Sequence, residues 1–193
     1  PLAGMLLAVN LDAEAVNGAG PPDWVVLLAR NRDGYRSLCR LSSAIQAHPQ
    51  REQLAKTGVR WGDLAANRAG LACLCGGRRS QIDAALRGGR NDRAAALLAR
   101  YAGVFDEECR LSLELHTAAD QAAARELAGL AGRFGVETVA VQPVYCLEAE
   151  DRRTLRVLAA IERNCLLDDL DRSPQGDAWH GGDETVDLHW LSP

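Results

Sequence analysis

Few residues in this 193-residue chain have both the type and the spacing that catalysis or metal binding requires. His116 follows Glu114 at a spacing of two in the run LSLELH, so a strand there would place both side chains on one face. None of the four histidines lies in an H-x-H or H-E-x-x-H spacing, in which two imidazoles can share a metal ion. Glu114 and His116 are therefore candidates for a catalytic or metal role, and a merely polar strand face is the alternative interpretation.

The segment CGGRRS, residues 75–80, is the main glycine-rich site. It matches neither G-x-x-x-x-G-K-[ST] nor G-x-G-x-x-G, so a phosphate-binding loop is not indicated. The glycines predict a tight turn at the end of a strand. Arg78 and Arg79 beside that turn are candidates for contact with an anion, and a solvated rim is the alternative.

Neither the cysteines nor the acidic residues form a recognisable metal-binding motif. The six cysteines contain no C-x-x-C pair or finger spacing, which excludes the common zinc modules, and most lie in apolar runs typical of reduced, buried thiols. Asp168, Asp169 and Asp171 are close in sequence, but a two-metal site needs ligands from several elements. We expect these three aspartates to lie in a loop and to be solvated.

The elements that would position these residues alternate between strands and helices. Short apolar runs predict strands at residues 5–9, 25–29, 71–75, 111–115 and 138–141. Most of these runs are continuous, which is typical of parallel strands covered on both faces. The pattern therefore predicts an α/β fold.

Helical periodicity follows several of these strands. It predicts helices after residues 33–34 and 91–92, at residues 119–134 and 149–163, and a short one at 61–66 within the polar stretch 47–67. The expected buried stripes are Leu127, Leu130 and Phe134 in one helix, and Leu155, Leu158 and either Ile161 or Glu162 in another. Residues 171–187 are expected to form an extended surface loop.

Composition restricts the class of protein further. Hydrophobic residues make up 47% and charged residues 25%, which is typical of a globular domain. A net charge of -4 without a basic block argues against strong DNA binding by this chain alone. No apolar run approaches the roughly 18 to 20 residues that span a bilayer, so we expect a cytoplasmic protein without membrane contact. The chain begins at Pro1, which suggests a piece of a longer protein.

Several blocks together resemble one known family. Residues 24–43 (WVVLLARNRDGYRSLCRLSS), 70–77 (GLACLCGG), 111–120 (LSLELHTAAD), 136–169 and 187–193 occur in the order and spacing of that family. They are similar to the N-terminal PHP (polymerase and histidinol phosphatase) domain of bacterial DNA polymerase III alpha subunits, including their error-prone relatives.

The resemblance implies a seven-stranded α/β barrel related to the TIM fold, with the opening strands of the family absent from this chain. We therefore expect residues 1–193 to form a single, incomplete barrel of five or six strands. Its sheet should be mainly parallel and open at the edge beside residues 5–9. Residues 170–193 should form an extended segment leading towards a polymerase palm.

The resemblance also locates the metal ligands that many family members carry at their strand ends. Those positions fall at or near Met5, Gly77, Ala118, Pro143 and Tyr145, none of which is a histidine or a carboxylate. The hypothesis is therefore that this domain has no catalytic residues, no metal and no other cofactor.

Three functions follow from these alternatives. The favoured one is a non-catalytic structural domain that packs against the palm and thumb of its own DNA polymerase. The second is a metal-dependent phosphoesterase or 3'-5' proofreading exonuclease, and the third is a free-standing α/β binding domain.

Overall fold

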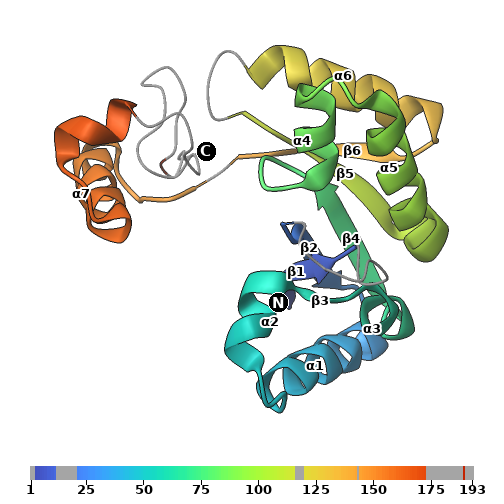
Figure 1. The fold of residues 1–193 in the computed structure, drawn as a ribbon. Helices are drawn as coiled ribbons and strands as arrows, with labels where there is room; N and C mark the ends of the chain where they lie inside the picture. Colours follow the sequence, from blue (N-terminus) through green and yellow to red (C-terminus); the bar gives the residue numbers. More distant parts are fainter. Residues whose placement is uncertain (1–2, 12–20, 116–119, 143, 173–188, 190–193) are drawn as a thin grey trace. The chain divides into compact units, whose positions relative to one another are not determined.

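The computed structural model describes residues 3–11, 21–115, 120–142, 144–172 and 189, which form an α/β fold (Figure 1). The strands are β1 (Gly4–Asn10), β2 (Asp23–Ala29), β3 (Val59–Arg60), β4 (Leu71–Gly76), β5 (Cys109–Glu114) and β6 (Glu137–Val141). The α-helices are α1 (Arg32–Gln46), α2 (Arg51–Thr57), α3 (Trp61–Ala66), α4 (Gln81–Arg87), α5 (Asn91–Phe105), α6 (Asp120–Arg133) and α7 (Arg152–Arg163). Short 3-10 helices are η1 (Asp106–Glu108), η2 (Ala149–Asp151) and η3 (Leu167–Arg172). All five strands expected from the sequence are confirmed.

The six strands form one sheet in the order β3-β1-β2-β4-β5-β6. β2 is antiparallel to both β1 and β4, whereas β1 pairs with β3 and β4 pairs with β5 in parallel. The expectation of a mainly parallel sheet is therefore wrong. Continuous apolar runs indicate that a strand is covered on both faces, but they do not determine its direction. The link between β1 and β2, residues 11–22, is also at the short limit for a crossover, which takes roughly a dozen residues or more.

The edge of the sheet differs from the expectation as well. β3 lies outside β1, so residues 5–9 are not in the last strand of the sheet. β3 pairs with β1 only at Val9 and Asn10. A two-residue strand has no periodic signal, which is why the sequence pattern did not indicate β3.

The two faces of the sheet are covered unequally. Along β2, side chains alternate between fully buried and half-buried, with Val25 and Leu27 on the buried face. The side chains that share the other face are apolar and only partly covered, and Leu6 is 55% exposed. On the buried face, the strands pack with α1, α4 and α5. The largest fully buried side chains of this core are Tyr101, Leu27, Leu41, Leu64, Leu71, Ile82, Leu98, Leu111, Leu130 and Val9.

Local sequence explains where several helices begin and end. The Asn31 side chain accepts hydrogen bonds from the backbone N–H groups of Asp33 and Gly34, which caps α1. α6 ends before Gly135, whose φ of +66° suits the left-handed position after a helix, as expected. Leu127 and Leu130 are buried in α6, but Phe134 is 41% exposed because it follows the last helical turn, so that part of the predicted stripe is wrong.

Two helices were not expected. α2 lies in the polar stretch that was predicted to hold one short helix, and α4 follows the glycine turn. Both are seven residues long and show no clear 3.6-residue period, whereas the short helix expected at 61–66 is present as α3. Within the described ranges, no helix is long and apolar enough to cross a membrane.

The chain divides into two compact units. Unit 1 comprises Pro1–Ser112 and Glu126–Val139, and unit 2 comprises Leu113–Arg125 and Ala140–Pro193. In unit 2, Leu155 of α7 is buried as expected, but Leu158 and Ile161 are exposed, so the predicted stripe of this helix is wrong beyond its first turn. The extended segment expected at residues 170–193 lies outside the described residues except for 170–172 and 189.

Candidate functional site

Polar residues of unit 1 gather at one end of the sheet, where several strands end and β2 begins. β1 and β4 both run antiparallel to β2, so their carboxyl ends lie where β2 begins. Val9 pairs with Asp23, and Gly76 pairs with Ser112 of β5 at the same edge. In α/β proteins, binding sites commonly form at the carboxyl ends of parallel strands. We call these four residues, Val9, Asp23, Gly76 and Ser112, the strand-end edge, since they lie where β1, β4 and β5 end and β2 begins.

Asp23 is the buried centre of the strand-end edge, with 0% of its surface exposed. Its Oδ1 accepts hydrogen bonds from the backbone N–H of Trp24 at 3.0 Å and of Gln81 at 2.8 Å. Its Oδ2 accepts a hydrogen bond from the Tyr101 hydroxyl at 2.7 Å. Burial raises the pKa of Asp23 above its usual value, and these hydrogen bonds oppose that rise.

Two arginine-tryptophan stacks flank the Asp23–Tyr101 pair. The Tyr101 ring meets the Trp61 ring edge-on at 5.0 Å, and the Arg100 guanidinium lies 4.5 Å from the centre of the Trp61 ring. On the other side, the Arg79 guanidinium lies 4.1 Å from the centre of the Trp24 ring. Both contacts are within the range of a cation-π interaction.

The glycine turn joins this network. Gly76 and Gly77 have φ values of +83° and +81°, and the N–H of Ser80 donates to the carbonyl of Gly77 at 3.1 Å. The Ser80 hydroxyl accepts a hydrogen bond from the N–H of Ile82 at 3.0 Å and caps α4. The prediction of a tight turn here is confirmed.

The geometry of the strand-end edge favours a structural role. Asp23 and Tyr101 are both fully buried, so neither side chain is available to a dissolved substrate. Their hydrogen bonds connect the start of β2 to α4 and α5. Sequence reasoning missed this pair, although an aspartate that opens the apolar run WVVLLA is a detectable signal, because a buried carboxylate needs partners.

The candidates from the sequence have different outcomes. Arg79 is exposed and stacks on Trp24, whereas Arg78 is half-buried. Glu114 is half-buried at the end of β5. His116 lies outside the described residues, so its expected pairing with Glu114 stays a prediction. Asp168 and Asp169 lie in η3 rather than in a loop.

The positions expected from the resemblance to correspond to family metal ligands carry neither imidazole nor carboxylate groups. Met5 is a half-buried thioether in β1, Gly77 has no side chain, and Tyr145 is a phenol that is 40% exposed in unit 2. Ala118 and Pro143 lie outside the described residues. These residue types do not fit a divalent ion, which prefers imidazole or carboxylate ligands. In the part of the chain that the structure describes, no three His, Cys, Asp or Glu residues are grouped so that they could hold a metal.

Three cysteines share the buried face of β4 and β5. The sulfur of Cys75 lies 3.8 Å from that of Cys109, and Cys73 is fully buried beside them. The hydrogen bond with Cys109, together with burial, raises the pKa of Cys75 well above its usual value, so this thiol stays protonated. The prediction of buried thiols is correct for these three, but Cys39 is exposed, and Cys146 and Cys165 are half-buried.

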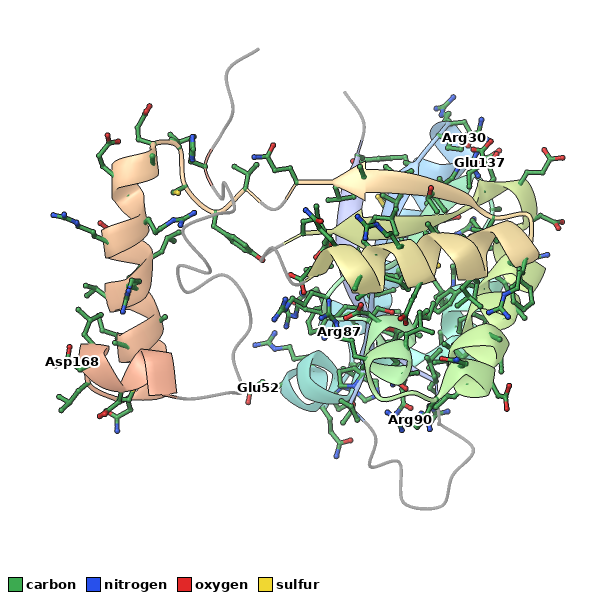
Figure 2. The ribbon with its side chains drawn as sticks, turned by 90° about the horizontal axis from the view of Figure 1, so that it is seen from above. Arg30, Glu52, Arg87, Arg90, Glu137 and Asp168 are labelled. Carbon is green, nitrogen blue, oxygen red and sulfur yellow. The ribbon has the colours of Figure 1, made fainter. Side chains whose placement is uncertain are left out.

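The opposite end of the sheet in unit 1 carries ion pairs. Arg30 pairs with Glu108, and Nε of Arg110 lies 2.8 Å from Oε2 of Glu137. Figure 2 labels Arg30 and Glu137 at this end of the sheet. An open depression of about 340 Å³ beside Arg30 also contains Arg68, Asp106 and Glu108 among its lining residues. Its charges are of both signs, which is typical of a solvated rim rather than of a site for one charged ligand.

Comparison with known proteins places these observations in a family. The sequence profile of the PHP domain matches residues 1–118. The DNA polymerase III subunit alpha of Caulobacter vibrioides (strain NA1000 / CB15N) is 34% identical over 135 residues, which cover 66% of this chain and 12% of the relative. The DNA polymerase III subunit alpha of Bacillus subtilis (strain 168) is 25% identical over 169 residues, which cover 88% of this chain and 14% of the relative.

This chain thus spans only about an eighth of the length of these relatives, and its similarity is to their PHP domain. The profile match covers more than half of the 193 residues and includes both the sheet from β1 to β5 and the strand-end edge. The chain belongs to the PHP domain family.

Proposed function

We propose that this chain is a non-catalytic, structural PHP domain of a cytoplasmic DNA polymerase of the polymerase III alpha type. Both relatives described above are alpha subunits that are many times longer than this chain. In this proposal nucleotide transfer takes place outside these residues. The domain packs against the palm and thumb of its own polymerase, and residues 170–193 lead towards the palm.

The observation that carries this proposal is the set of residues at the matched ligand positions. Metal-dependent phosphate hydrolysis uses the ion to activate water and to neutralise charge on the phosphoryl group. Met5, Gly77 and Tyr145 supply neither imidazole nor carboxylate. The best-positioned carboxylate of unit 1, Asp23, is fully buried and bonded to Tyr101 and Gln81. We infer that the domain uses no metal or other cofactor.

The sheet supports an incomplete barrel of the PHP type as the architecture. One sheet face carries apolar side chains that are only half covered within the described residues, and in a closed barrel such a face would point inward. We therefore propose that further strands complete the barrel in the full polymerase. The side chains of this face are Leu6, Trp24, Val26, Leu28, Ala72 and Leu74.

A phosphoesterase assay tests this proposal directly. The purified chain is incubated with a generic phosphomonoester and then with a mispaired primer, each with added Mn²⁺, and its metal content is measured after dialysis. We expect no turnover above the Mn²⁺ blank and no stoichiometric metal. Turnover that disappears with a chelator would revive the phosphoesterase alternative.

A matched variant identifies the source of any such turnover. Replacing both Glu114→Gln and His116→Gln removes the candidate acid-base pair at the end of β5 while keeping side-chain size similar. Turnover that falls in this variant would assign catalysis to that pair. Turnover that is unchanged would indicate a contaminating enzyme or another site.

DNA binding by the chain alone is expected to be weak. The net charge is -4, so long-range attraction to phosphate is absent. Titration with single- and double-stranded DNA at about 0.15 M salt should give no binding tighter than the roughly 10⁻⁴ to 10⁻⁶ M of non-specific contacts. Tighter binding that the double variant Arg78→Glu, Arg79→Glu abolishes would contradict this expectation and assign an anion-binding role to the glycine turn.

A further inference from the structure

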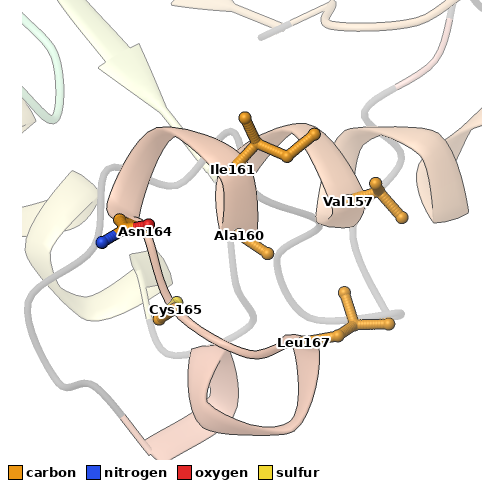
Figure 3. A pocket seen from close by; sticks show the side chains of 6 residues that line it. All are labelled: Val157, Ala160, Ile161, Asn164, Cys165 and Leu167. Atoms are coloured by element: carbon orange, nitrogen blue, oxygen red, sulfur yellow. The ribbon is translucent and has the colours of Figure 1, made fainter.

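Unit 2 contains an apolar groove of about 350 Å³ along one side of α7 (Figure 3). The groove is open to solvent, and it lies beside the second half of α7 and the turn that follows this helix. The residues that line the groove are Val157, Ala160, Ile161, Asn164, Cys165 and Leu167.

Three of the large apolar side chains of α7 are exposed, and Leu155 is the buried exception. Val157 is 46% exposed, Leu158 is 49% exposed and Ile161 is 69% exposed. Residues at spacings of three and four lie on one side of a helix, so these three form a continuous exposed stripe. We call these three residues together with Leu167, which is 43% exposed and lines the same groove, the α7 apolar face.

The packed side of α7 is small by comparison. Ala159 and Ala160 form the buried cluster of this helix, with Cys165 partly buried against them. An amphipathic helix normally buries its largest apolar residues and exposes its smaller or polar ones. Here Leu155 is buried, but the other three large aliphatic side chains, Val157, Leu158 and Ile161, are exposed, which is typical of a surface that another protein segment covers.

The charge of unit 2 indicates what kind of surface would fit. Unit 2 contains 13 acidic and six basic residues, whereas unit 1 contains 13 acidic and 16 basic residues. Asp168, directly after Leu167, is exposed at the end of the groove (Figure 2). An anionic polymer such as DNA is therefore disfavoured as the occupant. α7 itself carries four arginines, whereas Asp168 and Asp169 follow the groove, so an apolar surface with charges of both signs at its margin would match the groove and its surroundings.

The relatives indicate where such a surface would come from. The Bacillus subtilis alignment leaves 24 of the 193 residues unmatched, so it includes α7 whichever end those residues occupy. In that relative the aligned region is 14% of the polypeptide, which leaves a large amount of protein in the same chain.

We propose that the α7 apolar face docks against an apolar surface in the polymerase part of the same longer chain. This inference rests on the proposed function and specifies which surface of the domain makes the contact. Covering Val157, Leu158 and Ile161 would remove them from water and would anchor unit 2 within the polymerase.

Cysteine labelling tests the contact without disrupting it. Ile161→Cys is introduced into the 193-residue chain and into the full-length polymerase chain, and its reaction with a maleimide is followed by peptide mass spectrometry. We expect rapid labelling in the 193-residue chain and at least tenfold slower labelling in the polymerase. Glu52→Cys, at an exposed position of α2 in unit 1, is the control and should label rapidly in both proteins.

Each other outcome overturns the inference. Equal labelling of Ile161→Cys in the two proteins would mean that the face is open in the polymerase. Protection in the 193-residue chain that increases with protein concentration would assign the face to a second copy, and protection independent of concentration would mean that it is already covered.

The readout separates failure of this inference from failure of the proposed function. Phosphate hydrolysis by the domain would overturn the non-catalytic assignment but would leave the protection of Ile161→Cys unaffected. A gene that ends with this chain would overturn both. Lack of protection in a full-length polymerase whose PHP domain is inactive would overturn the docking inference alone.

Discussion

Units 1 and 2 use their apolar residues in opposite ways. In unit 1 the buried face of the sheet packs with helices, and side chains such as Leu27, Ile82 and Leu98 are fully buried. In the described part of unit 2, α7 buries Leu155 and two alanines, with a half-buried cysteine against the alanines, while Ile161 is 69% exposed. Because burial of apolar area is the dominant favourable term in folding, unit 1 carries most of its own stability and unit 2 depends more on additional contacts.

Charge reinforces this difference. Basic residues exceed acidic ones in unit 1, and acidic residues are about twice as frequent as basic ones in unit 2. The net charge of the whole chain conceals this separation. Substitutions in the two units should therefore differ in their effect on the isolated chain, and the following experiments test that difference.

The largest effect is expected from the buried network of unit 1. Asp23→Ala leaves the Tyr101 hydroxyl and the N–H groups of Trp24 and Gln81 without their acceptor. We expect a loss of roughly 3 to 5 kcal/mol in the free energy of unfolding, measured by urea denaturation. Asp23→Asn is the control, because its Oδ1 still accepts both backbone bonds and its amide can donate to the Tyr101 oxygen. An equal loss in both variants would show that the charge itself is needed.

A pair of truncations compares the two units directly. Leu98→Ala removes a fully buried side chain of α5 and should cost roughly 2 to 5 kcal/mol. Ile161→Ala removes an exposed side chain of α7 and should change the unfolding free energy of this chain by no more than about 0.5 kcal/mol. Similar costs for the two substitutions, measured by urea denaturation with probes in both units, would contradict the comparison.

A smaller effect is expected where α1 approaches the sheet. A Cβ added at Gly34 would lie 2.0 Å from the carbonyl oxygen of Gly70 and 3.1 Å from Cα of Ala29, so the backbone would have to move. Gly34→Ala should therefore lower the thermal midpoint, at a cost of roughly 1 to 3 kcal/mol.

Gly103→Ala in α5 is the matched control for Gly34→Ala. No atom lies within 4 Å of its added Cβ among the described residues, and alanine is the better helix former, so this change should stabilise by up to about 1 kcal/mol. A stabilising Gly34→Ala would mean that the helix and sheet are not packed as closely as the structure indicates.

The smallest effect is a pH dependence of unit 1. Burial raises the folded-state pKa of Asp23 above its usual value. The stabilising contribution of this carboxyl is therefore complete below the unfolded-state pKa and is lost as the pH rises through the folded-state pKa. Relative to the natural chain, Asp23→Asn should become more stable as the pH increases from about 4 to 7. The measurement is the urea midpoint of both proteins across that pH range. A difference between the two midpoints that stays constant with pH would show that the Asp23 carboxyl does not titrate in this window.

Local patterns were sufficient to locate most elements of the fold. The apolar runs identified β1, β2, β4, β5 and β6, and the left-handed glycine after α6 marked its end. These signals depend on neighbouring residues alone. β3 was missed because two residues establish no period. α2 and α4 were also missed, and length alone does not explain this, because the six-residue α3 was predicted.

The candidate site was less accessible to sequence reasoning. The expected tight turn at Gly76 and Gly77 is present, and Arg79 lies beside it. The Asp23–Tyr101 pair was not expected, because the two residues are 78 positions apart and only the packing of α5 on the sheet brings their side chains within 2.7 Å. A lone aspartate before an apolar run does not identify its partner.

The amino-acid sequence by itself determined the type and place of the main elements, the absence of donors at Met5, Gly77 and Tyr145, and the family resemblance, since each is a property of residue identity and short-range order. Only the tertiary structure decided the antiparallel direction of β2 and the exposure of Leu158 and Ile161. The helix propensity and the hydrophobicity of an apolar residue are the same whether its side chain contacts its own domain or another segment. Which side of α7 is buried therefore depends on contacts between residues distant in the chain, and periodicity does not encode those contacts.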